Sequence, residues 1–216
     1  YSGASSAIRE STISDNGAQQ AGGIGNYGQL YVVNSTISRN YANGDAGGVY
    51  NGLAAYFYNA SIINNDADHD RDELGGIGGG LYVEPGSPTF VVNTLVLDNT
   101  IEDAPIYDDC HGTLIGYGAN LFTDISGCTV DGARTIVPLG TMGALQDNGG
   151  PTLTHAPHAD SLAIDNTNDA LGCVDETGAP LSIDQRGAAR IAGLRCDIGA
   201  LEVGAAVERI FRSGFE

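Results

Sequence analysis

The chain contains 216 residues, with 27 acidic and 9 basic side chains and a formal net charge of −18 at pH 7. This charge argues against a nucleic-acid partner, because the phosphate backbone would repel it. Every basic residue is arginine, which excludes Schiff-base chemistry and isopeptide crosslinks through lysine. No apolar run has the length that a transmembrane helix needs. Short Val, Ile and Tyr segments between the 32 glycines predict an all-β fold.

A seven-residue string recurs in the first hundred residues. The copies are ESTISDN at 10–16, NSTISRN at 34–40, NASIINN at 59–65 and NTLVLDN at 93–99. Glycine-rich strings precede three of them, namely GGIGN at 22–26, GGVYN at 47–51 and GGLYV at 79–83. A period of about 25 residues is typical of repeat architectures, in which each repeat contacts only its neighbours.

Each repeat contains three short segments with the composition of strands, separated by Gly or Asn at corners that need a positive φ. Stacked at about 4.8 Å per repeat, such units form a parallel β-solenoid of triangular section. We expect the asparagines that close the string to form a hydrogen-bonded ladder along one corner. These residues are Asn16, Asn40, Asn65 and Asn99. Asn34 and Asn59 also begin glycosylation sequons, which the repeat itself explains.

The second strand of each repeat is apolar on both faces. If Leu30 and Val32 point inward, Tyr31 points outward, where polar residues normally alternate. We expect this row either to be covered by residues 129–205 or to dock another subunit or a sugar. Its aromatic members are Tyr31, Tyr56, Tyr58 and Phe90.

The chain begins within the second strand of a repeat. An uncapped solenoid end exposes unpaired backbone groups and an apolar cross-section. We therefore expect either further coils before Tyr1 or a partner, such as a second copy, that stacks on this end.

The third repeat is longer because of an acidic insertion, at residues 66–78. Oxygens at alternate positions of a tight loop can converge on Ca²⁺, although the glycine and the distant glutamate of an EF-hand loop are missing. The alternative is a solvated acidic loop. The candidate calcium ligands are Asp66, Asp68, Asp70 and Asp72.

Two adjacent carboxylates, Asp108 and Asp109, precede His111 in YDDCHG. Paired carboxylates can divide acid and base work in glycoside hydrolysis. Neighbouring residues of a strand point to opposite faces, however, so we favour a structural role. Arg71 has the chemistry of a lyase base, but an ion pair within the insertion is the simpler interpretation. We assign no catalytic residue.

The four cysteines form two separated pairs, without the CxxC spacing of zinc sites. Proximity in the sequence favours the disulfides Cys110–Cys128 and Cys173–Cys196, and hence an oxidising compartment. The other two connectivities and four buried thiols are the alternatives. Near the second pair, Asp184 and Arg186 are interpreted as a structural ion pair.

Further motifs follow the repeats: GANLFTDISGC at 118–128, MGALQDNGGPTLTH at 142–155, CDIGALE at 196–202 and RIFRSGFE at 209–216. Together with the repeats, they resemble right-handed parallel β-helix repeat proteins of the bacterial secreted choice-of-anchor type. The resemblance covers nearly the whole chain. It implies an extracellular or cell-surface location and no single activity, because β-helices carry lyases, hydrolases, adhesins and passive scaffolds.

We expect parallel β-helix coils over 1–128, a disulfide-stapled cap over 129–205 and a tail over 206–216. Phe211 and Phe215 of the tail are expected to dock into a neighbouring subunit, and binding of the tail to an anchoring machinery is the alternative. The expected function is that of a secreted, non-catalytic structural protein that self-associates through its solenoid end and aromatic face. The alternative is a polysaccharide-binding or polysaccharide-degrading protein on the same scaffold.

Overall fold

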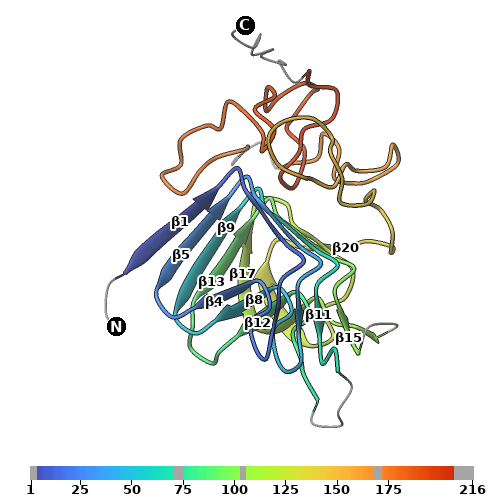
Figure 1. Ribbon diagram of the computed structural model, residues 1–216. Helices are drawn as coiled ribbons and strands as arrows, with labels where there is room; N and C mark the ends of the chain where they lie inside the picture. The colour runs from blue at the N-terminus through green and yellow to red at the C-terminus, as the bar shows by residue number, and fades with distance from the viewer. Residues whose placement is uncertain (1–3, 71–74, 103–105, 168–171, 207–216) are drawn as a thin grey trace, which may run out of the picture.

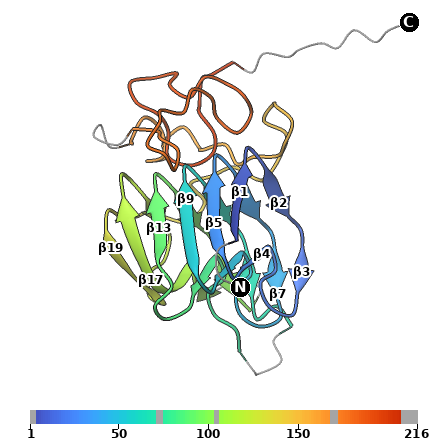
Figure 2. The ribbon, with the colours of Figure 1, turned by 90° about the vertical axis from the view of Figure 1, so that its left-hand side faces the viewer.

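The computed structural model describes residues 4–70, 75–102, 106–167 and 172–206. Within these ranges the chain forms β-strands and no α-helix, and most strands stack side by side along one axis (Figures 1 and 2). The strands pair in parallel sheets, apart from one antiparallel pair, β15 with β16. The sequence-based prediction of an all-β chain with parallel sheets is confirmed.

The largest sheet has nine strands and folds around one corner of the stack, because β17 pairs with strands of both of its limbs. One limb consists of β1 (Ser5–Arg9), β5 (Gln29–Val33), β9 (Ala54–Tyr58), β13 (Thr89–Val92), β17 (Cys110–Tyr117) and β19 (Cys128–Gly132). The other limb consists of β4 (Ile24–Asn26), β8 (Val49–Asn51) and β12 (Leu81–Val83).

Two smaller sheets complete the stack. The second sheet contains, in order, β2 (Thr12–Ser14), β6 (Thr36–Ser38), β10 (Ser61–Ile63), β14 (Leu95–Leu97), β18 (Leu121–Phe122) and β20 (Thr135–Ile136). The third sheet contains β3 (Gly17–Ala18), β7 (Tyr41–Ala42), β11 (Asp66–Ala67), β15 (Thr100–Ile101) and β16 (Ile106–Tyr107).

Equivalent residues of successive repeats lie opposite one another. Ile37 of β6 is in register with Ile13 of β2 and with Ile62 of β10. Tyr31 of β5 is likewise in register with Tyr56 of β9. The register therefore follows the alignment of the sequence repeats.

The corners of the repeats use non-glycine residues at positive φ. One corner has φ values of 45° to 50° at Glu10, Asn34, Asn59 and Asn93. The next has φ values of 54° to 59° at Asp15, Arg39, Asn64 and Asp98. Asn and Asp tolerate this region better than most residues, which accounts for their frequency at these positions.

The stack differs from the sequence-based expectation in two details. Each of the first four repeats carries a two-residue strand in the third sheet, in addition to the three expected segments. The strands also continue beyond residue 128, because β19 pairs with β17 and β20 pairs with β18. Neither feature repeats the recurring string, so the sequence pattern did not reveal them.

Inward side chains from the sheets form one hydrophobic core. Val32, Phe57 and Leu114 from the largest sheet meet Ile62 and Phe122 from the second, and all five are fully buried. Burying such a side chain stabilises the fold by about 1.5 to 3 kcal/mol. The core therefore holds the repeats together from within.

The C-terminal region, residues 137–206, lies over the outer face of the second sheet (Figure 1). Met142 and Ile198 join Ile63 and Leu97 in a second hydrophobic cluster. Thr36 donates a hydrogen bond to Gln185 at 2.6 Å, and the Ala200 N–H donates to Ser61 Oγ at 3.0 Å. The apolar outer face of β10 and β14 is thus covered by the end of the chain.

Asparagines at the first corner also bind this region. Asn34 Nδ2 donates to the Ile183 carbonyl at 2.7 Å, and Asn59 Nδ2 donates to the Val174 carbonyl at 3.0 Å. Both side chains are fully buried. In the folded chain these two sequons are therefore inaccessible, in agreement with their interpretation as products of the repeat.

Candidate functional site

The four asparagines of the expected ladder form a continuous hydrogen-bonded chain. Asn16 Nδ2 donates to Asn40 Oδ1 at 2.9 Å, and Asn40 Nδ2 donates to Asn65 Oδ1 at 2.9 Å. Asn65 Nδ2 then donates to Asn99 Oδ1 at 3.0 Å. Each acceptor oxygen also receives the backbone N–H of the preceding asparagine, at 3.0 to 3.2 Å. The ladder thus satisfies backbone and side-chain groups at a corner where Asn40, Asn65 and Asn99 are fully buried.

Asp109 receives the end of this ladder. Its Oδ1 accepts Asn99 Nδ2 at 2.9 Å and the Asn99 N–H at 3.1 Å. Its Oδ2 accepts the N–H groups of Thr123 and Asp124 at 2.6 and 2.9 Å. Burial raises the pKa of Asp109 to about 7, against the four N–H donors, which favour the carboxylate. The fully buried Asp109 carboxyl thus has a structural role, because it accepts hydrogen bonds from N–H groups at this corner of the stack.

Asp108 is also buried and accepts the Gly78 N–H at 2.7 Å. Burial raises its pKa, and this hydrogen bond opposes the rise. The side chains of Asp108 and Asp109 therefore bind different backbone groups, at Gly78 and at Thr123 and Asp124 respectively. This arrangement fits the structural interpretation of the YDDCHG motif.

Aromatic rings of the largest sheet stack in a row across neighbouring strands, along the axis of the stack. The ring centroids are 4.8 Å apart between Tyr31 and Tyr56, 5.0 Å between Tyr56 and Phe90, and 6.2 Å between Phe90 and Tyr117. The interplanar angles are 16°, 5° and 11°, so neighbouring rings cover each other's faces. We call this set the first aromatic row. Its middle rings cannot offer a face to a sugar.

The first aromatic row stays largely uncovered. Tyr31, Tyr56 and Phe90 are half-buried, and Tyr117 is 50% exposed. The C-terminal region reaches this face near Tyr58, where residues 174–178 border a cavity of about 190 Å³. Residues 137–167 and 172–206 therefore lie over the second sheet and reach the first aromatic row only at this edge. Phe211 and Phe215 lie outside the described residues.

A second aromatic row runs along the other limb of the same sheet. It consists of Tyr27, Tyr50, Tyr82 and His111, with centroid distances of 5.5, 5.2 and 5.0 Å. The recurring seven-residue string does not reveal this row, although Tyr50 and Tyr82 occupy the same place in GGVYN and GGLYV. The glycine at that place in the first repeat, Gly25, obscured the pattern.

The acidic insertion is described only in part, because Asp72 lies outside the described residues. Asp66 Oδ1 accepts Thr100 Oγ1–H at 2.7 Å, and Asp66 Oδ2 pairs with His69 Nδ1 at 2.9 Å. Asp68 is buried, whereas Asp70 is exposed. In residues 4–70 and the other described ranges, no three His, Cys, Asp or Glu side chains are grouped for a metal ion. Calcium binding stays a prediction.

Both expected disulfides are present. Cys110–Cys128 links β17 to β19, and Cys173–Cys196 closes a loop of the C-terminal region. Arg186 forms an ion pair with Asp184 at 2.8 Å, as the sequence suggested. His155 is buried and contacts Ser38 Oγ at 2.9 Å and the Gly143 carbonyl at 2.7 Å.

The C-terminal region encloses a buried charge cluster that no sequence motif predicts. Arg190 is 1% exposed and donates to Cys173 Sγ at 3.2 Å and to the Gly199 carbonyl. Glu202 is fully buried and accepts the N–H groups of Ala192 and Asp197 at 3.0 and 2.9 Å. Burial raises the pKa of Glu202 to about 7. The spacing of these residues in the sequence does not predict the cluster, because irregular turns of the C-terminal region bring them into proximity.

The raised pKa of Glu202 leads to a pH-dependent stability. A carboxyl that holds its proton more tightly when folded contributes stability at low pH, and this contribution is lost as the pH rises to about 7. We expect the stability of the native chain relative to Glu202→Gln to fall by about 2 to 3 kcal/mol between pH 5 and pH 8. Urea unfolding of both proteins at each pH measures this.

The comparison with Glu202→Gln is needed because His155 acts in the opposite direction. Burial lowers the pKa of His155, so its contribution to stability grows as the pH rises. A difference between the two proteins that does not change with pH would contradict the role of Glu202.

Comparisons with protein-family models, with curated proteins and with solved structures find no match. Among the described residues, no helix is long and apolar enough to cross a membrane. The resemblance to choice-of-anchor β-helix proteins thus rests on the sequence motifs alone.

Proposed function

We propose that the chain is a right-handed parallel β-helix from a secreted or cell-surface protein. It serves as a non-catalytic structural subunit that associates with copies of itself through the end of its coil stack. The in-register parallel pairing of successive repeats and the two disulfides support this proposal. The stacked strands make each subunit rigid, and end-to-end association of copies builds a filament.

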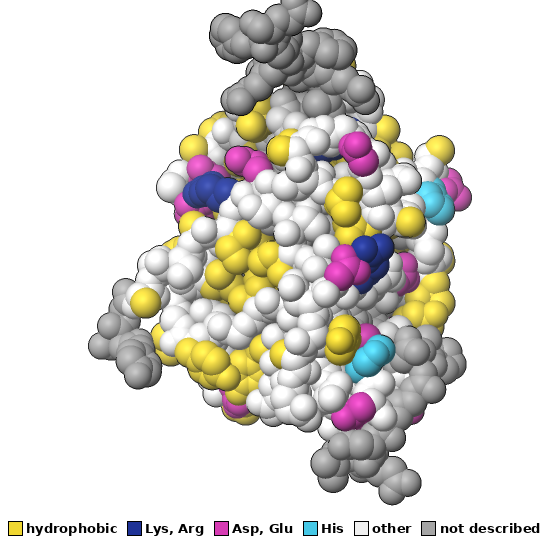
Figure 3. All heavy atoms as spheres, in the orientation of Figure 1, with side chains coloured by type: hydrophobic (Ala, Val, Ile, Leu, Met, Phe, Trp, Pro, Cys, Tyr) yellow, Lys and Arg dark blue, Asp and Glu magenta, His cyan; other side chains and the backbone are white. Residues whose placement is uncertain are grey.

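The observation that carries the proposal is the one-sided pairing of the first repeat. Within the described residues, β1, β2, β3 and β4 each have a strand partner on one side only. Ile8, Ile13 and Ile24 are half-buried at this end. Figure 3 faces the first repeat and shows hydrophobic side chains gathered on it. Strand addition, either by further repeats that precede Tyr1 or by a second copy of this chain, would pair these edges and cover these side chains. The self-association proposed here corresponds to the second copy.

The hydrogen bonds of β1 show which groups are free for such addition. The Gln29 N–H donates to the Ala4 carbonyl, and the Glu10 N–H donates to the Val33 carbonyl. The backbone N–H and C=O groups of successive residues point alternately to the two sides of a strand. The even-numbered residues of β1 therefore bond to β5, and the N–H of Ala7 points to the open edge. Ala7 is exposed.

We expect Ala7→Pro to abolish self-association while leaving the fold intact. Proline removes the edge N–H of Ala7 and costs no bond to β5. Ala7→Ser keeps the N–H and is the matched control, so it should associate like the native chain. Sedimentation velocity over a range of concentrations measures the effect. A native chain that stays monomeric at high concentration, or an Ala7→Pro variant that still associates, would contradict the proposal.

Polysaccharide binding is the second candidate function. It is favoured by a cavity at the corner between the two limbs of the largest sheet. An enzymatic version would release reducing ends or unsaturated sugars from a polysaccharide panel, and this assay separates it from binding alone.

A further inference from the structure

The corner between the two limbs of the largest sheet changes along the stack. Two residues connect β4 to β5 and β8 to β9, whereas residues 84–88 connect β12 to β13. In the next repeat β17 runs through the corner without a break, from Cys110 to Tyr117. The protruding third connection and the flat fourth one create a step, and a cavity of about 370 Å³ lies at this step. Ligand cavities start at about this size.

The sequence explains why the third corner protrudes. In the first two repeats the corner is closed by Asn26, whose Nδ2 donates to Asn51 Oδ1 at 2.7 Å. Val83 stands at the equivalent position in the third repeat and cannot continue this pair. Thr89 Oγ1 accepts Asn51 Nδ2 instead, at 2.8 Å. The residues between Val83 and Thr89 therefore do not follow the path of the first two corners, and they protrude from the stack.

The wall of the cavity is a closed turn. The Ser87 N–H donates to the Glu84 carbonyl at 3.0 Å, and Gly86 has a φ of 87°. Proline at the second position and glycine at the third are typical of a type II turn. The wall is therefore formed before any ligand binds, which reduces the entropic cost of binding.

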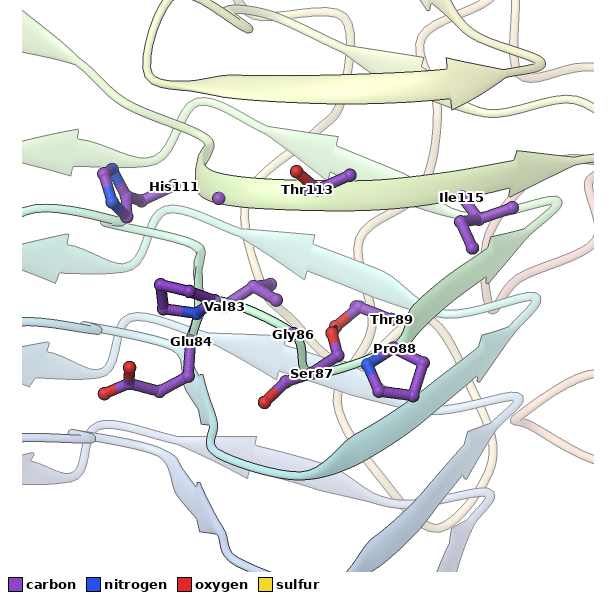
Figure 4. Close-up of a pocket in the computed structure, with 11 residues that line it drawn as sticks. Val83, Glu84, Gly86, Ser87, Pro88, Thr89, His111, Thr113 and Ile115 are labelled. Carbon is purple, nitrogen blue, oxygen red and sulfur yellow. Dashed lines mark hydrogen bonds between the residues drawn. The ribbon is translucent and has the colours of Figure 1, made fainter.

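The cavity has an apolar end and a polar end. Figure 4 shows Pro88 and Ile115 at one end and Glu84 and His111 at the other, with the hydroxyls of Ser87 and Thr113 between them. Tyr50 donates its phenolic proton to Glu84, and this bond raises the pKa of Tyr50. This hydrogen bond holds the Glu84 side chain at the polar end of the cavity.

Three polar side chains at the cavity remain without a hydrogen bond. In the described part of the chain, Ser87 Oγ, Thr113 Oγ1 and the ring nitrogens of His111 have no such partner. The His111 ring is held by its stacking on Tyr82, at the end of the second aromatic row. Two hydroxyls and a stacked imidazole are therefore available for hydrogen bonds beside an apolar surface.

We propose that this corner cavity binds one neutral hexopyranose unit of a glycan. A pyranose has an apolar C–H face, which suits Pro88 and Ile115, and hydroxyls, which suit Glu84, His111 and Thr113. A single sugar in this cavity avoids the covered faces of the aromatic rows. Glu84 and the net charge of −18 oppose uronic acids and other anionic sugars. The proposal is independent of self-association.

Isothermal titration calorimetry of the full chain tests the proposal. The probes are cellohexaose, maltohexaose, mannohexaose and galactohexaose, with hexagalacturonic acid as the anionic comparison and spermine as the cationic one. We expect one or more of the neutral sugars to bind, and neither charged probe. Binding of no neutral sugar, or stronger binding of either charged probe, would overturn the proposal.

Matched variants then locate the site. Glu84→Gln keeps an acceptor for Tyr50 but removes the charge, and Thr113→Val removes one hydroxyl at constant shape. We expect the first to weaken sugar binding about tenfold and the second about fivefold, as for a lost hydrogen bond to a charged and a neutral group. Thr129→Val is the control, because Thr129 is in register with Thr113 but does not line the cavity. Equal affinities for all three variants would place binding elsewhere.

Discussion

Asn65→Ala is expected to lower the free energy of unfolding by about 4 kcal/mol, because it leaves several buried groups without partners. Asn65 Oδ1 accepts both the N–H and the Nδ2 of Asn40, at 3.1 and 2.9 Å. Asn65 Nδ2 donates to the Ile37 carbonyl at 3.1 Å and to Asn99 Oδ1. An alanine methyl replaces none of these bonds. Urea denaturation followed by circular dichroism measures the loss.

Asn16→Ala is the matched control for this prediction. Asn16 stands at the exposed start of the same ladder, where water can replace the lost hydrogen bonds. Its substitution should cost no more than about 1 kcal/mol. Similar losses for Asn16→Ala and Asn65→Ala would show that the ladder is not a cooperative, buried element of the stack.

Gly48→Ala should destabilise the chain by about 3 kcal/mol or more, because the repeats approach too closely there for a side chain. A Cβ atom on Gly48 would lie 2.4 Å from the Gly80 carbonyl oxygen and 3.1 Å from the Asn65 side chain. Gly80 belongs to the next repeat, so the two repeats would have to separate. Thermal unfolding followed by circular dichroism reports the change.

Gly25→Ala separates this steric effect from the general cost of replacing a glycine. Gly25 is the exposed residue of strand β4, and its added Cβ would be 3.5 Å from Ala21 Cβ, an ordinary contact. We expect a change within about 0.5 kcal/mol. If Gly48→Ala is as well tolerated as Gly25→Ala, the repeats do not approach each other as closely at Gly48 as the structure shows.

The sequence revealed the features of the fold that repeat. The recurring string locates the closing asparagines, and its alternation separates inward Val32 from outward Tyr31. It also located both disulfides through the proximity of the cysteines. These features are visible because stacking places like residues over like, so each repeat carries the same requirement.

Features that break the repeat escaped the sequence analysis. The corner cavity exists because Val83 replaces an asparagine and the connection lengthens, and neither change has a signature of its own. The electrostatic interaction between Arg190 and Glu202 depends on turns of the C-terminal region, which follow no period. The sequence also does not show that the C-terminal region covers the second sheet. Both this sheet and the first aromatic row present apolar side chains, and the sequence does not indicate which of them the C-terminal region covers.

The central claim is that successive repeats stack in register, and nuclear Overhauser contacts between isoleucine methyl groups test it most directly. In a chain with labelled isoleucine methyls, we expect Ile37 to show contacts with Ile13 and with Ile62, its register partners on either side. Contacts of Ile37 with neither residue, in a folded sample with assigned methyl signals, would contradict the account.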